Sequence, residues 1–219
     1  MNSPEESQGL VEQVLTKEEQ AKLRPADVIA AFKEGNARFV AGELTVRNHK
    51  AQIRKAAEGQ FPKAIVLSCI DSRIPVEDVF DRGIGDIFVA RVAGNLVNTD
   101  ILGSMEFACA VKGAKLILVL GHENCGAVKG AIDRVTFGNI TPMLEKIQPA
   151  VDAVPGFEGA RVSSNAEFLH SVTEENVRLN IERIRSGSIA LAQMERDQDI
   201  GIAAAIYGMD EGRVVFLDS

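Results

Sequence analysis

Residues 64–73 read AIVLSCIDSR, an apolar run that leads directly into a thiol, a carboxylate and a guanidinium. The run is short, contains β-branched residues and follows Pro62, which is typical of a buried strand. Residues two apart in an extended segment point to the same side of it. We therefore expect Cys69, Asp71 and Arg73 to face one pocket at the carboxyl end of this strand.

A second apolar run, residues 116–120, ends in a similar way, in the sequence GHENCG at residues 121–126. Ligands of open α/β sheets bind at the carboxyl ends of the strands, so both motifs lie where a site is expected. Zinc prefers thiolate and imidazole ligands in a tetrahedral arrangement. The sequence therefore predicts one zinc ion held by Cys69, His122 and Cys125.

Asp71 has two possible roles at such a site. Three protein ligands are typical of a catalytic zinc, whose fourth position is left to water or substrate. Asp71 either binds the metal and closes that position, or pairs with Arg73 and leaves it open to a water whose pKa zinc lowers from about 15.7 to about 7. The simpler interpretations are buried apolar cysteines, a structural zinc closed by Asp71, and a plain Asp71–Arg73 ion pair. The presence of both motifs, each at the end of a strand, favours a catalytic zinc site over these simpler interpretations.

The rest of the chain alternates segments typical of strands with segments typical of helices. This pattern predicts an α/β fold with a mostly parallel central sheet and helices on both faces, and the turn at residues 210–212 predicts an antiparallel C-terminal edge strand. We expect strands at residues 63–69, 87–92, 115–120, 200–207 and 213–217, and helices at 25–42, 51–58, 76–81, 98–111, 126–135, 141–153, 164–185 and 188–196. No glycine motif for a dinucleotide or a nucleoside triphosphate follows a strand.

We expect a single domain over residues 1–219, in which residues 1–60 form a helical N-terminal arm. Apolar residues between positions 10 and 15 have helical spacing, and an apolar stripe within residues 25–42 ends at a glycine. The arm precedes the first strand and has few apolar residues for a core of its own. We therefore expect it to pack on a partner subunit.

The composition argues against several classes of protein. The net charge of −7 argues against nucleic acid and anionic membrane surfaces, which both favour a basic face. No apolar stretch approaches the roughly 18–20 residues that span a bilayer, and the polar N-terminus has no signal-peptide core. Three cysteines are too few for a disulfide scaffold, so we expect a cytoplasmic protein. Cys109 is expected in the core, and His49 and His170 at the surface.

These motifs resemble those of the β-class carbonic anhydrases. The resemblance rests on Cys-x-Asp-x-Arg at residues 69–73 followed by Gly-His-x-x-Cys-Gly at residues 121–126, and it extends over about residues 60–135. It implies reversible hydration of carbon dioxide to bicarbonate and a proton by attack of zinc-bound hydroxide. It assigns Zn²⁺ to Cys69, His122 and Cys125, and the catalytic dyad to Asp71 and Arg73.

The resemblance also implies a substrate pocket and an assembly. Gln60 stands where many members carry a glutamine that hydrogen-bonds a substrate oxygen, and the Gly126 amide faces the substrate. The apolar walls correspond to Phe88 and Ala93, and to Phe107 of a partner subunit. The family commonly has tyrosine at the last position, so phenylalanine loses a hydroxyl there. Members form dimers or assemblies of dimers, so a homodimer or homotetramer is expected.

Some bacterial members close the metal with the aspartate and bind bicarbonate at a second site that uses a tryptophan. This chain has no tryptophan and has Val66 at that position, although Arg91 matches the arginine of that site. We therefore expect the open form, with Asp71 bound to Arg73. The alternatives are a hydrolase of carbonyl sulfide or carbon disulfide on the same scaffold, and a non-catalytic zinc protein that senses bicarbonate.

Overall fold

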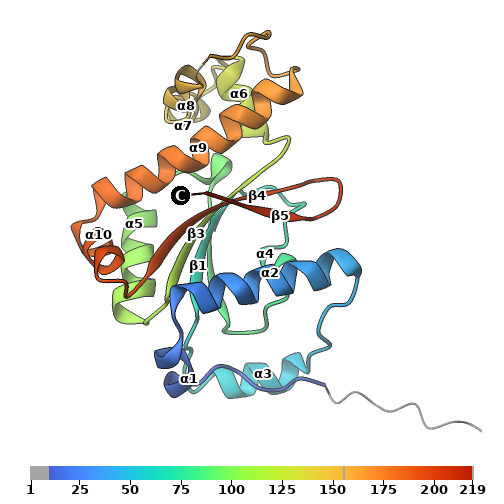
Figure 1. Cartoon of the computed structure of the whole chain (residues 1–219), viewed down its shortest axis with the longest axis vertical. Coiled ribbons are helices and arrows are strands. Elements are labelled where there is room, and N and C mark those ends of the chain that lie inside the picture. The colour runs from blue at the N-terminus through green and yellow to red at the C-terminus, as the bar shows by residue number, and fades with distance from the viewer. Residues whose placement is uncertain (1–9, 155, 219) are drawn as a thin grey trace, which may run out of the picture.

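The computed structural model describes residues 10–154 and 156–218, which fold around one five-stranded sheet. The strands lie in the order β2-β1-β3-β4-β5 (Figure 1). They are β1 (Ala64–Ser68), β2 (Ile87–Arg91), β3 (Leu116–His122), β4 (Gly201–Tyr207) and β5 (Val214–Leu217). All neighbouring pairs are parallel except β4 and β5, which are antiparallel. The α/β fold with its antiparallel C-terminal edge strand is confirmed.

The register of the sheet brings the two motifs together. Ser68, the last residue of β1, pairs with Leu120 of β3 and with Arg91 of β2. Cys69 therefore leaves the sheet one residue below the level of His122, which lies on the neighbouring strand. Every residue of β1 and β3 is buried, as expected for central parallel strands covered on both faces.

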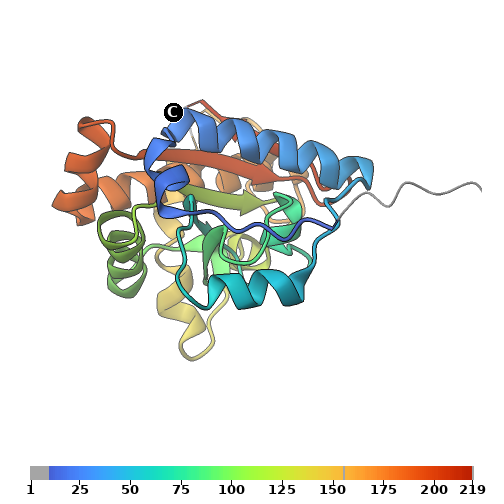
Figure 2. The same cartoon turned by 90° about the horizontal axis from the view of Figure 1, so that it is seen from below.

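Each face of the sheet carries its own apolar core, and Figure 2 shows helices on both sides. On one face lie α2 (Pro25–Ala41) and the short α4 (Val76–Val79), which bury Phe32 and Phe80 against Leu116 and Leu118. On the other face lie α5 (Thr99–Glu106), α9 (Ala166–Gly187) and α10 (Ile189–Arg196). A third apolar cluster beyond the strand ends joins Cys69 and Cys125 to the helices that follow β3.

The N-terminal arm differs in part from the expectation. Helix α2 ends where predicted, at Gly42, whose φ of 72° is the left-handed conformation that glycine adopts without strain. It packs on the sheet of its own chain, and Gly35 lies so close to Phe80 that a Cβ would meet the Phe80 carbonyl oxygen at 1.9 Å. Packing of the arm on a partner stays a prediction.

The predicted helical segment at residues 10–15 is wrong. Val11 forms a parallel bridge with Arg47, and the chain enters a helix only at α1 (Lys17–Lys22), where the Thr16 side chain caps the first turn. The capping box of Thr16 and Glu19 sets the start of α1, and the backbone of Val11 instead forms hydrogen bonds with that of residues 46 and 48. The prediction that residues 1–9 belong to the arm concerns residues outside the described ranges.

The remaining helices follow the predicted segments with shifted ends. They are α3 (His49–Ala56), α6 (Gly126–Ile132), α7 (Ile140–Leu144) and α8 (Gln148–Ala153). The segment predicted as one helix at residues 141–153 is divided between α7 and α8. Asn98 caps α5, which continues as the π-helical turn η2 (Phe107–Val111) and holds Cys109 in the core, as expected. Burial raises the pKa of the Cys109 thiol to about 12.

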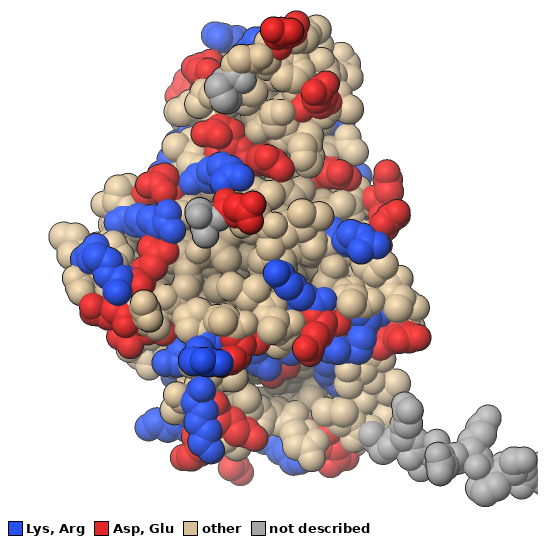
Figure 3. Space-filling view, in the orientation of Figure 1, with Lys and Arg blue, Asp and Glu red and all other residues tan. Residues whose placement is uncertain are grey.

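Charges of both signs are interspersed over the face of the molecule seen in Figure 3, with no field of one sign. His49 and His170 are exposed, as expected, and His170 lies 3.2 Å from Glu174. No helix in the described part of the chain combines the length and the apolar character that crossing a bilayer requires.

Candidate metal centre

Three side chains from two strand ends form the candidate metal centre. Cys69 follows β1, His122 ends β3, and Cys125 is the residue immediately before α6. The sulfur atoms of both cysteines and a ring nitrogen of His122 all lie within 4.8 Å of one another, and all three residues are buried. Two thiols and one imidazole are the donors that zinc prefers, and three protein ligands leave one coordination position free.

The histidine is held in the tautomer that a metal ligand requires. Its Nδ1–H donates to the carbonyl oxygen of Glu123 at 2.8 Å, which leaves Nε2 as the acceptor. Nε2 is buried and has no hydrogen-bond partner among the described residues. An unpartnered acceptor in the interior is costly unless a cation occupies its lone pair, so the donor set fits a metal ion.

The sulfur atoms of the two cysteines lie close together, so the charge of one affects the pKa of the other. A hydrogen bond from the Cys125 thiol lowers the pKa of Cys69 against the opposing effect of burial, and the Gly94 amide acts in the same direction. The same thiol–thiolate hydrogen bond and burial raise the pKa of Cys125. A divalent cation that replaces the thiol protons would pair with both sulfurs at once.

Asp71 is held by Arg73 and does not join the group of close ligand atoms within the described residues. Arg73 donates from Nε to Oδ1 at 2.9 Å and from Nη2 to Oδ2 at 2.7 Å, and its backbone N–H donates to Oδ1 at 3.0 Å. These hydrogen bonds hold the pKa of Asp71 well below its usual range. The chain turns at Ser72 and Arg73, so the strand alternation that we used for this segment ends at Cys69.

A second arginine supports the same segment from the neighbouring strand. Arg91, the last residue of β2, donates from Nε to the carbonyl oxygen of Cys69 at 2.9 Å and from Nη2 to that of Asp71 at 2.6 Å. Both carbonyls belong to residues of the candidate site. Arg91 therefore positions the backbone that carries the first metal ligand and the carboxylate.

The predicted pocket residues lie in two places. Ala93 begins the 3-10 turn η1 (Ala93–Asn95), whose next residue, Gly94, donates its N–H to the Cys69 sulfur at 3.4 Å. Gly126 is exposed at the start of α6, and a Cβ built on it would meet nothing within 4 Å. Both therefore lie beside the candidate metal ligands.

The other predicted pocket residues lie away from the triad of their own chain. Gln60 is exposed and precedes β1, whereas Cys69 follows the opposite end of that strand. Phe88 is level with the second residue of β1, and its ring lies 6.5 Å from that of Phe107, which is 49% exposed. Together they line a surface hollow of about 760 Å³ along β2 and α5.

Two features of the site were missed at the level of sequence. The first is the role of Gly94, which the dipeptide Gly94-Asn95 after a strand could have suggested as a turn. The second is a pair of asparagines, Asn176 and Asn180, in the apolar stripe of α9. Polar residues four apart on the buried face of a helix are the signal that would have found them.

The comparison with known proteins assigns the family. A family model described as carbonic anhydrase matches residues 64–214, which include all three candidate metal ligands. The chain belongs to the carbonic anhydrase family. Carbonic anhydrase 2 of Mycobacterium tuberculosis is 35% identical over 202 residues, which cover 89% of this chain and 93% of that protein. The carbonic anhydrase of Mycolicibacterium smegmatis is 34% identical over 87% of this chain and 92% of its own length.

Solved structures show that this carbonic anhydrase has the β-class fold. The β-carbonic anhydrase CafA of Aspergillus fumigatus superposes with a TM-score of 0.67 at 24% identity, covering 88% of this chain and 90% of its own. A structure from the report of two tetrameric β-carbonic anhydrases of Sordaria macrospora gives a TM-score of 0.68 at 23% identity, covering 89% and 98%. The resemblance drawn from the motifs is thereby confirmed.

Proposed function

We propose that this carbonic anhydrase catalyses the reversible hydration of carbon dioxide to bicarbonate and a proton, with zinc as its metal. The observation that carries the proposal is the buried Cys69–His122–Cys125 triad, whose ligand atoms lie within 4.8 Å of one another beside the Asp71–Arg73 pair. The similarity to curated carbonic anhydrases over most of the chain supports it.

The residues of the candidate site have different roles in this reaction. Cys69, His122 and Cys125 would hold the ion, which lowers the pKa of bound water from about 15.7 to about 7 and so supplies a nucleophile at neutral pH. Asp71, kept ionised by Arg73, is an acceptor that would take a hydrogen bond from a hydroxyl group and so orient it. The Gly126 amide, exposed at the start of α6, is a donor for a substrate oxygen.

The geometry of Asp71 supports the open form at neutral pH. Both carboxylate oxygens are engaged by one guanidinium, a bidentate pair that is stronger than a single neutral hydrogen bond. Binding of the carboxylate to the metal would require these bonds to break. We therefore propose that water occupies the fourth position, as expected from the sequence.

A partner subunit would complete the pocket. Gln60 and Phe107 are exposed and lie away from the triad of their own chain, so they are available to the site of a second copy. We propose that the protein is a homodimer or homotetramer in which Gln60 and Phe107 of one subunit face Ala93 of the other. Sedimentation equilibrium tests this, because a monomer at the concentration of the activity assay contradicts it.

The decisive experiment is stopped-flow measurement of carbon dioxide hydration, together with the zinc content of the purified protein. One zinc per chain and hydration that is abolished by a chelator and restored by zinc are expected. Turnover of carbonyl sulfide or carbon disulfide without hydration of carbon dioxide would show the alternative hydrolase. Bound zinc with no turnover of any of these molecules would show a non-catalytic protein.

The same proposal places the enzyme in the cytoplasm. Cys69, Cys109 and Cys125 are free and buried, which suits a reducing compartment. Fractionation of cells that express the full chain tests this, and recovery in the periplasmic or extracellular fraction would contradict it.

A further inference from the structure

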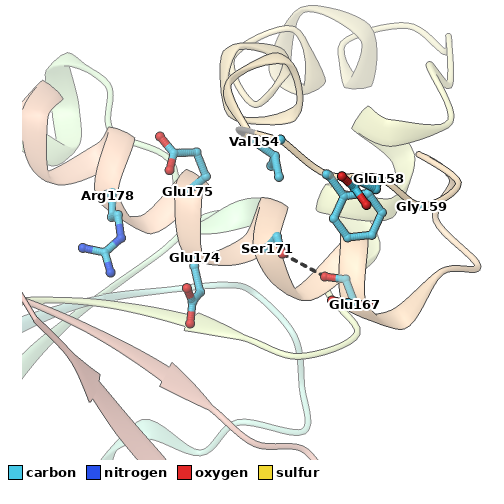
Figure 4. Close-up of a pocket in the computed structure, with 10 residues that line it drawn as sticks. Val154, Glu158, Gly159, Glu167, Ser171, Glu174, Glu175 and Arg178 are labelled. Atoms are coloured by element: carbon cyan, nitrogen blue, oxygen red, sulfur yellow. Dashed lines mark hydrogen bonds between the residues drawn. The ribbon is translucent and has the colours of Figure 1, made fainter.

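Helix α9 has two faces of different character. Figure 4 shows its outer side beside Val154 and residues 156–159, where a hollow of about 560 Å³ opens to solvent. Its side chains in that hollow are charged or polar: Glu167, Ser171, Glu174, Glu175 and Arg178. The inner side packs on the sheet and is apolar except at a few positions, among them Asn176 and Asn180. Both asparagines are completely buried, at 0% exposure.

The two asparagines form a directed chain of hydrogen bonds. The backbone N–H of Val97 donates to Oδ1 of Asn180 at 2.9 Å, and Nδ2 of Asn180 donates to Oδ1 of Asn176 at 3.2 Å and to its backbone oxygen at 2.8 Å. Nδ2 of Asn176 then donates to the carbonyl oxygen of Gly94 at 3.0 Å.

The direction of this chain follows from its two ends. A backbone N–H can only donate, so Val97 requires the oxygen of Asn180. A carbonyl oxygen can only accept, so Gly94 requires the nitrogen of Asn176. One orientation of each amide satisfies both ends. Arg183 adds a longer contact of 3.5 Å to Oδ1 of Asn180 while it bonds the Lys146 carbonyl at 2.7 Å.

The end of the chain lies one hydrogen bond from a metal ligand. Gly94 donates its N–H to the Cys69 sulfur at 3.4 Å. Its φ of 72° and ψ of 17° are in the left-handed region, where glycine is free to rotate and other residues are not. The N–H of such a flexible residue keeps one direction only if a neighbouring peptide group is fixed. The hydrogen bond from Asn176 to the Gly94 oxygen fixes the peptide group that follows Gly94.

We propose that Asn176 and Asn180 are positioning residues of the metal centre, which act by holding the Gly94 N–H on the Cys69 sulfur. The proposal rests on the proposed function, in that Cys69 must be a metal ligand. A hydrogen bond to a thiolate stabilises its charge and fixes the direction of its lone pairs. Leucine at these positions would bury apolar surface without the desolvation cost of an amide, so packing alone does not account for asparagine.

The test uses three variants of one helix face. Asn176→Leu removes the donor to Gly94, and Asn180→Leu removes the group that orients Asn176. Thr173→Val is the matched control, because Thr173 is 2% exposed and its hydroxyl bonds only the Leu169 carbonyl of its own helix, at 2.8 Å. We would measure zinc affinity by chelator competition and, in the cobalt-substituted proteins, the thiolate-to-cobalt charge-transfer band.

Both leucine variants are expected to bind zinc about 10- to 100-fold more weakly and to shift the charge-transfer band, whereas Thr173→Val changes neither. The double variant is expected to be no weaker than Asn176→Leu, because both changes act through Gly94. Wild-type zinc affinity and spectrum in the folded leucine variants would overturn the proposal, as would an equal loss in Thr173→Val or an additive loss in the double variant.

Two further outcomes separate this proposal from the one on which it rests. If Asn176→Leu does not fold, Asn180→Leu carries the test, since it leaves the Asn176 side chain in place. If the wild-type protein itself binds no zinc, the proposed function is wrong, whereas a zinc-binding wild type with unchanged variants contradicts the positioning role alone.

Discussion

The guanidinium of Arg73 holds both carboxylate oxygens of Asp71, at 2.9 and 2.7 Å, two residues beyond the first candidate metal ligand. The side chain of Arg73 is 55% exposed and that of Asp71 is 17% exposed. The pair therefore lies at the mouth of the centre, where its carboxylate can meet a substrate without being a ligand. Its contribution to stability is small, because exposed ion pairs are screened by water.

Replacing Asp71 by asparagine is expected to lower the rate of carbon dioxide hydration by roughly 100-fold or more while zinc stays bound. The amide keeps the shape of the side chain but loses the negative charge that accepts a hydrogen bond from a hydroxyl group. Stopped-flow rates and zinc analysis of the same preparation check this. Asp78→Asn is the control, because Asp78 is exposed on α4. Full activity of Asp71→Asn would contradict the assigned role.

Replacing Arg91 by methionine is expected to weaken zinc binding about 10-fold, since the carbonyls of Cys69 and Asp71 lose their common donor. Chelator competition measures the change. Arg178→Met is a matched control, because Arg178 also donates to a backbone carbonyl, that of Asp218, at 2.7 Å. Equal zinc affinity in the two variants would show that Arg91 does not support the centre.

Replacing Gly94 by alanine is expected to destabilise the fold more than the same change at Gly42. Both glycines have a φ of 72°, so each alanine carries a similar left-handed strain of about 1 kcal/mol. A Cβ at Gly94 would also meet Ile147 at 2.8 Å, whereas one at Gly42 would meet nothing within 4 Å. The extra overpacking adds about 1–3 kcal/mol. Urea unfolding of the two variants measures the difference, and equal values would contradict this account.

The stability of the protein is expected to depend on Asp81 below about pH 4. Burial alone would raise the pKa of this carboxyl, but hydrogen bonds from Thr45, Arg38 and Arg47 outweigh it and lower the pKa from 3.8 to about 2. The carboxylate is completely buried, and each of the two arginines lies 2.6 Å from it. A lowered pKa stabilises the fold above the unfolded value, and this contribution is lost as the pH falls through the folded value.

The loss between about pH 5 and pH 2 should amount to about 2 kcal/mol. Asp81→Asn is expected to be less stable than the wild type at pH 7, with a gap that narrows as the pH falls toward 2. Denaturant unfolding of both proteins over that range measures the gap. A constant gap would mean that Asp81 does not titrate with the lowered pKa.

Much of the fold and the close grouping of the candidate metal ligands could be predicted from local patterns. Short β-branched runs set β1 and β3, and the parallel order places their carboxyl ends side by side, so Cys69, His122 and Cys125 were identified from residue type and position. The helix at residues 10–15 was wrong because apolar spacing alone does not reveal a bridge to residue 47. The apolar stripe of α2 likewise did not indicate on which face of the sheet the helix packs.

The sequence by itself determined the chemistry of this protein: two thiols, an imidazole, a carboxylate and a guanidinium after two buried strands. Only the tertiary structure decided how they are held. In the folded chain Asn176 donates to the Gly94 carbonyl, and Arg91 donates to the carbonyl of Cys69. Gln60 lies at the opposite end of β1 from the triad. The physical reason is that these contacts join residues 22 to 82 positions apart, and strand order and helix packing set such contacts where local propensity does not.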